Sequence, residues 1–317
     1  MIARLREPNR HRRRPTVIMR TSAPLLALAA IALVAGCGGA DQTASGTSTA
    51  AAPAAGIAHP TGARDVVVRV ASGGGFVAVE TNLASLPSYT LYGDGTVIRT
   101  VAAPAGSALA LGAGAAPQLE TGHLDEAAVQ DLLVQAERAG LLAPGAIDYG
   151  DMGSVGVADM PTTTVTLAAG DAKVSRDAYG LGAGEVPGGH SLTAAQQADR
   201  AALSGFVALT EGTLPDAKPY VPERVAVFVA PGLSQPQPSD GEPATLPIGA
   251  DLATLSAAGA GSAAGFGCTV VEGAAVPKLL AVTARPSASG LWRGPRGKET
   301  YRVVVRPLLP DETGCPA

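Results

Sequence analysis

The sequence predicts an α+β fold with mixed or antiparallel sheets and a few packed helices. Two observations carry this prediction: strand-like runs follow one another across short turns, and the helical segments come in groups. A regular alternation of strand and helix, which would indicate a doubly wound sheet, is missing from the sequence. Hydrophobic residues make up 46% of the 317 residues and charged residues 16%, which is enough to form one large core or two smaller ones.

Residues 63–212 are expected to form one α+β domain. Its predicted strands are 65–70, 88–92, 96–100, 162–167 and 172–178. An Asp-Gly turn joins the second strand to the third and a Gly-Asp turn joins the last two, so both pairs are expected to be hairpins. Val66, Val68 and Val70 alternate along the first strand and should therefore share one face. Residues 102–118 are expected to form a loop.

Two helices are predicted in the same range. Asp125 is expected to cap the first helix, and Gly140 to end it in the left-handed conformation. Thr193 and Gln196 stand at the spacing of a capping box, so the second helix should begin there. The expected buried side of this helix carries Ala195, Ala202, Phe206 and Leu209.

Residues 220–317 are expected to form a smaller α+β domain or the second half of the same domain. Its predicted elements are a strand at 224–230, a loop at 231–247, helices at 250–257 and 275–283, and a strand at 301–306. Because the strand at 224–230 is almost entirely apolar, it should be covered on both faces.

The first 36 residues are typical of an export signal. Residues 23–34 are apolar, uncharged and too short to span a bilayer. They end in Leu33-Val34-Ala35-Gly36-Cys37, which resembles the lipobox of bacterial lipoproteins and implies cleavage before Cys37 and acylation of its thiol. An ordinary secretory signal is the alternative. Met19 directly precedes the apolar run, so we expect translation to begin there.

An acylated Cys37 would anchor the chain to the outer face of the cell membrane, because two or more acyl chains bind a bilayer stably. Residues 37–62 are rich in small and polar types and are predicted to be a flexible linker. Seven of the 23 basic and one of the 27 acidic residues lie in the leader, which leaves 16 basic against 26 acidic residues. Such an acidic body excludes nucleic acid as a partner, since nucleic acid is bound through its phosphates.

The cysteine count predicts one disulfide. If Cys37 is acylated, Cys268 and Cys315 remain, and an even pair in an oxidising compartment is expected to be bonded. A catalytic thiol is the alternative, but no histidine lies near either residue in the sequence. No cofactor is predicted, because the glycine-rich segments lack the phosphate-binding patterns.

Asp148, Asp151 and Asp159 are weak candidates for a site. Three carboxylates in one loop could bind Ca²⁺ or act as an acid and base pair. Their spacing matches no known calcium loop, so turn residues and caps are the simpler interpretation. No metal site is therefore predicted.

Trp292, Arg293 and Arg296 form a second candidate, for binding. They bring the single tryptophan and two bases to a tight loop before the last strand, and Trp and Arg are typical of interaction hot spots. Alternatively, Trp292 covers the edge of the sheet while the bases remain in water.

Several segments together resemble a family of uncharacterised actinobacterial lipoproteins that share a domain of unknown function. The segments are Tyr89–Val97, the capped helix at 125–140, Asp148-Tyr149-Gly150, Ala158–Thr163, Val174–Tyr179, and Arg306–Pro310 with Cys315. This resemblance spans most of residues 63–317. It implies a type of organism and a compartment, but no activity.

The sequence therefore predicts a membrane-anchored, extracytoplasmic lipoprotein that binds a protein or a cell-wall component of the cell envelope without catalysis. Two alternatives stay open. One is a hydrolase with an acidic site near Asp148, Asp151 and Asp159. The other is a solute-binding protein of a transporter, although the strand and helix alternation of its two lobes is missing.

Overall fold

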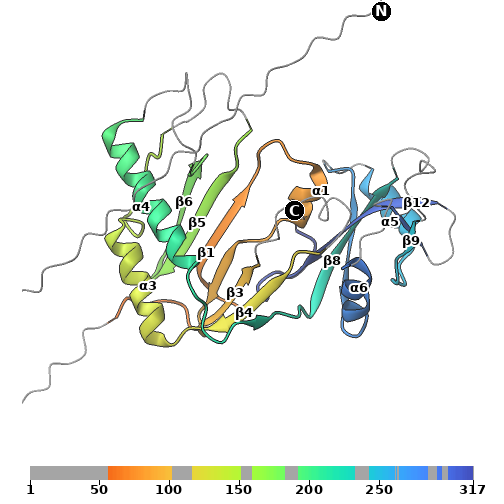
Figure 1. Ribbon diagram of the computed structural model, residues 1–317, viewed down its shortest axis with the longest axis horizontal. Helices are drawn as coiled ribbons and strands as arrows, with labels where there is room; N and C mark the ends of the chain where they lie inside the picture. The colour runs from red at the N-terminus through yellow and green to blue at the C-terminus, as the bar shows by residue number, and fades with distance from the viewer. Residues whose placement is uncertain are drawn as a thin grey trace, which may run out of the picture. The chain divides into compact units, whose positions relative to one another are not determined.

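The computed structural model describes residues 56–101, 116–150, 159–182, 192–232, 243–260, 262, 264–284, 291–294 and 299–316. All of them belong to one compact unit, Pro53–Ala317. The described part of the chain folds into two sheets and their covering helices, which confirms the predicted α+β class (Figure 1). The seven-stranded sheet takes its strands from residues 66–219 and the five-stranded sheet from residues 224–307.

The first sheet has seven antiparallel strands in the order β6-β5-β1-β2-β3-β4-β7. They are β1 Val66–Gly73, β2 Tyr89–Tyr92, β3 Thr96–Thr100, β4 Leu119–His123, β5 Thr162–Ala169, β6 Ala172–Tyr179 and β7 Lys218–Pro219. Both predicted hairpins are confirmed, since β2 pairs with β3 and β5 pairs with β6. The pairing of β1 with both β2 and β5 places the first strand inside the sheet.

The second sheet has five strands in the order β10-β8-β12-β11-β9. They are β8 Arg224–Pro231, β9 Ala244–Thr245, β10 Gly267–Glu272, β11 Trp292–Arg293 and β12 Thr300–Pro307. All pairs are antiparallel except β9 with β11. This sheet is therefore mixed, as the sequence predicts.

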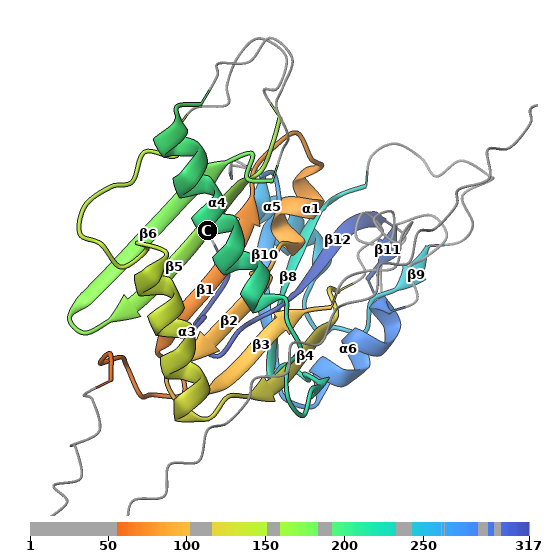
Figure 2. The same ribbon diagram turned by 60° about the vertical axis from the view of Figure 1, so that its left-hand side comes forward.

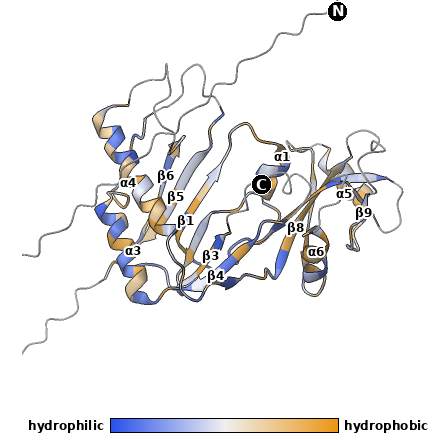
Figure 3. Ribbon diagram, in the orientation of Figure 1, coloured by the Kyte–Doolittle hydropathy of each residue, from blue (hydrophilic) through white to orange (hydrophobic). Residues whose placement is uncertain are grey.

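The described helices are α1 Val79–Ala84, α3 Glu126–Arg138, α4 Ala194–Thr210, α5 Leu252–Gly259 and α6 Ala275–Thr283. The α3 and α4 helices lie side by side across one face of the seven-stranded sheet (Figure 2). Orange and blue residues alternate around these two helices, as expected where one side is buried and the other meets water (Figure 3).

The predicted helix ends are confirmed. The Asp125 side chain accepts a hydrogen bond from the Ala128 amide at 2.9 Å, and Gly140 follows α3 with a φ of 71°. Thr193 and Gln196 exchange the two hydrogen bonds of a capping box at the start of α4. Local chemistry alone therefore determines where these two helices begin and where the first one stops.

The central strand of the second sheet is buried on both faces, as predicted. Val225, Val227 and Val229 pack on one side with α5 and α6. Ala226, Phe228 and Ala230 pack on the other side with α1. The apolar character of β8 thus follows from its position in the middle of the sheet.

The prediction that Val66, Val68 and Val70 share one face is wrong for Val66. A β-bulge shifts the register between Val66, which pairs with Tyr92, and Val68, which pairs with Leu91. The extra residue turns Val66 to the face opposite the helices, while Val68 and Val70 stay in the core under α3 and α4.

The predicted buried side of α4 is also largely wrong. Its buried residues are Arg200, Leu203, Phe206 and Thr210, so only Phe206 was predicted correctly. Leu209 is 53% exposed instead. The reason is Arg200, whose guanidinium donates to the carbonyls of Tyr149, Tyr179 and Gly180 and thereby brings a charged residue to the core side.

Several strands lie where none was predicted, namely β4, β7, β9, β10 and β11. They are short or rich in polar residues, with little alternation of their own. The β4 strand, Leu-Glu-Thr-Gly-His, follows the segment 102–118 that was expected to be a loop. Its pairing with β3 supplies the register that its own side chains do not specify.

The first described residues, from Gly56, already contact the folded unit, although they lie within the range that the sequence assigned to the linker. The Ile57 amide and carbonyl bond to the two ends of the Gln130 amide group at 2.7 and 2.9 Å. His59 lies 3.1 Å from the Glu126 carboxylate. Ile57 and His59 therefore lie along the first turns of α3, and this part of the predicted linker belongs to the folded unit.

The C-terminal segment after β12 connects the two sheets. Asp311 accepts hydrogen bonds of 2.7 Å from Arg69 of β1 and from Tyr92 of β2. Leu309 packs among Ile98, Leu119 and other residues on the face opposite α3 and α4. Further along, Cys315 is bonded to Cys268 of β10, which confirms the predicted disulfide.

Candidate functional site

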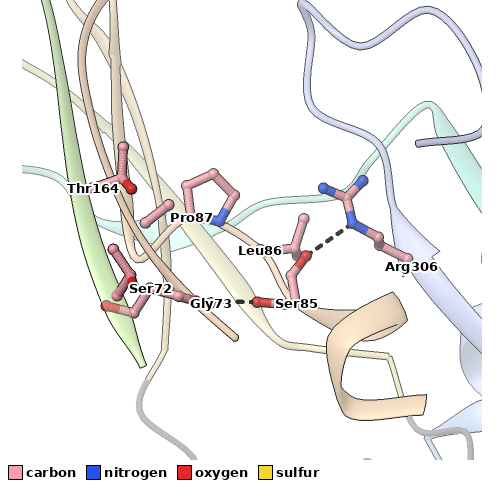
Figure 4. A pocket seen from close by; sticks show the side chains of 9 residues that line it. Ser72, Gly73, Ser85, Leu86, Pro87, Thr164 and Arg306 are labelled. Carbon is pink, nitrogen blue, oxygen red and sulfur yellow. Dashed lines mark hydrogen bonds between the residues drawn. The ribbon is translucent and has the colours of Figure 1, made fainter. Parts of the chain in front are cut away.

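A cleft of about 380 Å³ opens between the first sheet and α1 (Figure 4). We call it the α1 cleft. It is lined by Ala71, Ser72, Gly73, Ser85, Leu86, Pro87, Thr162, Thr164 and Arg306. Its size lies within the range of about 300–1,000 Å³ that is typical of small-ligand sites.

One wall of the α1 cleft comes from the polar face of β5. Val165 and Leu167 point into the core under the helices, so Thr162 and Thr164 point the other way. The Thr164 hydroxyl donates to a carboxylate oxygen of Asp177 at 2.6 Å. Because its one proton is used there, this hydroxyl presents acceptor lone pairs to anything else that binds.

The opposite wall comes from the turn after α1. Ala84 packs against the second sheet, and the next residue, Ser85, reaches across to the carbonyl of Ser72 at 3.5 Å. The Ser85 carbonyl in turn accepts a hydrogen bond of 2.9 Å from Arg306 (Figure 4). These bonds fix the distance between β1 and the turn.

The segment between β1 and α1 needs glycine. Gly74 and Gly75 have φ values of 79° and 80°, a left-handed conformation that side chains rarely adopt. A Cβ at Gly75 would lie 2.7 Å from the carbonyl oxygen of Asp159, so the backbone here packs directly against the start of β5. The next residue, Phe76, is 87% exposed.

Arg306 is the charged residue of the lining, and its charge is paired. Its guanidinium donates to both carboxylate oxygens of Glu312, at 3.0 and 2.7 Å, and its side chain is only 8% exposed. The Leu309 amide also donates to Glu312. Arg306 therefore holds the C-terminal segment in place, and the lining of the α1 cleft is close to neutral.

The three candidate aspartates do not form a site in the described residues. Asp148 accepts hydrogen bonds from the Gly150 amide and from Gln196, and these bonds hold its pKa below the usual value. It therefore stays ionised and serves as a turn residue. Asp159 is exposed beside Gly75, and Asp151 lies outside the described residues.

The interpretation of Trp292 as a binding residue is wrong. Its side chain is 0% exposed and packs in the core beneath α5 and α6, on a short strand rather than a loop. It pairs with Tyr301 and Ala244 of the neighbouring strands, so it lies within the sheet and does not cover its edge as the alternative interpretation expected. Arg293 is half-buried and Arg296 lies outside the described residues.

A second, smaller hollow of about 240 Å³ lies between the first turns of α3 and the C-terminal end of α4. It is lined mainly by apolar side chains, among them Leu124, Leu132 and the exposed Leu209. Two charged residues, Arg99 and Asp131, are also part of the lining, and Arg99 is paired with Glu120. The hollow thus presents leucine side chains and few free polar groups.

Sequence reasoning missed the residues of the α1 cleft. A signal was present for Thr162 and Thr164, because threonines alternate with apolar residues along β5 and alternation places them on one face. No signal was present for Ser85 or Arg306, which come from segments more than 200 residues apart.

The described residues form an α+β protein with a small cleft lined by hydroxyl-bearing and apolar residues. No family model, curated protein or solved structure that was compared with this chain matches it. Within the described ranges, no three Cys, His, Asp or Glu residues lie together as metal ligands would. A membrane-spanning length of apolar helix is likewise not found in those ranges.

Proposed function

We propose that this protein is a lipid-anchored lipoprotein on the outer face of the cell membrane, and that its folded unit binds an envelope component in the α1 cleft. The use of the cysteines carries the proposal. Cys268 and Cys315 are bonded to each other, as is typical of an oxidising compartment. Cys37 is then left over at the end of a lipobox-like sequence.

The position of the folded unit supports the same proposal. The first described residue, Gly56, comes 19 residues after Cys37. The composition of the residues between them predicts a flexible linker. A coil of that length would have a root-mean-square span of roughly 25 Å, sufficient to hold the folded unit clear of the lipid headgroups. The α1 cleft would then be accessible to components of the envelope. Cys37 and residues Leu33 to Gly36 lie outside the described residues.

Metabolic labelling with a palmitate analogue tests the anchor. We expect the wild-type chain to take up the label and to sediment with membranes, because acylation of Cys37 would attach it stably. The Cys37→Ala variant should do neither and should keep its leader. As a matched control, the double variant Cys268→Ala/Cys315→Ala lacks the other two sulfurs and should still be labelled. Wild-type protein without label would refute the proposed anchor.

A further inference from the structure

The chemistry of the α1 cleft points to an uncharged ligand. Ser85, Thr162 and Thr164 bring hydroxyl groups to the lining. The hydroxyls of Ser85 and Thr164 already donate to Ser72 and Asp177, so they offer acceptor lone pairs to a ligand. The positive charge of Arg306 is already paired with Glu312, so it offers little to an anion. No carboxylate is part of the described lining, and the one that contacts it, Asp177, accepts hydrogen bonds from Thr164 and Ser175. A ligand with many neutral hydroxyl groups, which can donate to these lone pairs, fits this lining best.

The topology argues against an extended peptide. The two strands that line the α1 cleft, β1 and β5, are interior strands that pair with each other along their length. Their backbone groups are used within the sheet, so a peptide cannot add to them as a further strand. Recognition in the α1 cleft must therefore come from side chains, and most of the polar ones are hydroxyls.

Phe76 is an exposed aromatic residue on the segment that joins the two walls of the cleft, outside the lining itself. The segment 74–78 connects the β1 wall, which ends at Gly73, with α1, whose C-terminal turn forms the opposite wall. Phe76 on this segment is 87% exposed, and Val77 beside it is 46% exposed. The Phe76 ring therefore offers an apolar face to a ligand that extends beyond the lining.

We propose that the α1 cleft binds an uncharged oligosaccharide, with Phe76 stacking against the apolar face of a sugar ring and the hydroxyls of Ser85, Thr162 and Thr164 bonding to its hydroxyl groups. The proposal rests on the proposed binding function and names the class of ligand. A sugar ring offers both surfaces that the site requires: hydroxyl groups around its rim and C–H groups on its faces. The low aromatic content of 3% is no obstacle, because one well-placed ring is sufficient.

Titration calorimetry on the full-length mature protein tests this proposal. The protein is held in a detergent without a sugar headgroup, since such a headgroup would compete. The probes are tri-N-acetylchitotriose, maltotriose and mannotriose, each titrated to about 10 mM, which covers affinities down to the millimolar range. We expect at least one of them to bind with saturation. Phe76→Ala should weaken that binding by about tenfold, and Thr162→Val and Thr164→Val by about threefold to tenfold.

Two variants serve as matched controls. Thr166→Val lies on the same strand and the same face as Thr164 but outside the cleft lining. Val221→Ala truncates another exposed apolar residue, 66% exposed, away from the site. Both should bind within about twofold of the wild type, because surface changes away from a site have small effects. Thermal melting of every variant separates loss of binding from loss of folding.

Three results would overturn the proposal. The first is no saturable binding of any of the three trisaccharides. The second is that Phe76→Ala and Thr164→Val bind the trisaccharide with the same affinity as the two control variants. The third is tighter, cleft-dependent binding of an anionic probe, a sulfated trisaccharide. Each of these is independent of palmitate labelling, so failure of the sugar proposal and failure of the anchor can be distinguished.

Discussion

Asp311 is the residue through which the C-terminal segment binds the first sheet. One of its oxygens accepts from both Arg69 and Tyr92 at 2.7 Å. Burial acts to raise the pKa of Asp311, but the hydrogen bonds from Arg69 and Tyr92 and the charge of Arg69 outweigh it, so the pKa lies below its usual value. The same pairing raises the pKa of Arg69 in spite of its burial. Both groups are therefore held in their charged forms.

The Asp311→Asn substitution should lower the free energy of unfolding by about 2 kcal/mol at neutral pH, the size expected for hydrogen bonds to a charged group. A lowered pKa stabilises the fold above the unfolded-state pKa of about 4, and this contribution is lost as the pH falls through the folded-state value. Urea unfolding measures this at pH 7 and pH 3. The free energies of unfolding of Asp311→Asn and wild type should differ less at pH 3 than at pH 7.

Asp131→Asn is the control for this measurement, because Asp131 lies exposed on α3. It should change stability by less than about 0.5 kcal/mol at either pH. If wild type and Asp311→Asn differed in free energy of unfolding by the same amount at both pH values, the assigned role of the carboxylate would be contradicted.

At the scale of elements, capping and packing determine different properties of the same helix. The capping box of Thr193 and Gln196 fixes where α4 begins, as the sequence predicted. The rotation of α4 depends on Arg200, whose guanidinium donates to carbonyls of two neighbouring segments. Burial of this guanidinium lowers the pKa of Arg200, yet an arginine remains charged at any ordinary pH. The start of the helix is local, whereas its buried face is set by distant carbonyls.

Thr193→Ala should therefore destabilise the protein by about 1 kcal/mol, because it leaves the amide at the third helical position without its partner. Ser204→Ala, a change in the middle of the same helix, is the comparison and should be close to neutral or slightly stabilising. Chemical unfolding followed by circular dichroism measures both. Equal effects of the two substitutions would argue against the capping role.

At the scale of the whole folded unit, the disulfide holds the end of the segment that connects the sheets. It closes a loop between residues 47 apart and ties Cys315 to an edge strand of the second sheet. Between these two cysteines lie the residues that bind the first sheet, Asp311 and Leu309. The bond therefore limits how far the connecting segment can move in the unfolded chain and in partly opened states.

Removal of both sulfurs in Cys268→Ala/Cys315→Ala should lower the free energy of unfolding by about 4 kcal/mol. The reason is that the bond reduces the conformational entropy of the unfolded chain by closing a loop of this length. Chemical denaturation of the variant and of the oxidised wild type provides the measurement. Cys37→Ala, which leaves the bond intact, should unfold like the wild type. A loss below about 1 kcal/mol would mean that the bond contributes little to stability.

The sequence by itself determined the features that depend on neighbouring residues. Turn residues identified the two hairpins, Asp125 and Thr193 marked the starts of two helices, and the continuous apolar run of β8 indicated a strand buried on both faces. The even number of remaining cysteines predicted the disulfide. In each case the physical cause lies within a few residues or in a simple count.

Only the tertiary structure decided the features that depend on distant contacts. The bulge after Val66 came from the register with β2, and the burial of Trp292 came from strands that its own short segment does not specify. The α1 cleft combines residues from three segments, 71–87, 162–164 and Arg306. No pattern within one segment can predict such a site, because its shape depends on how the segments pack.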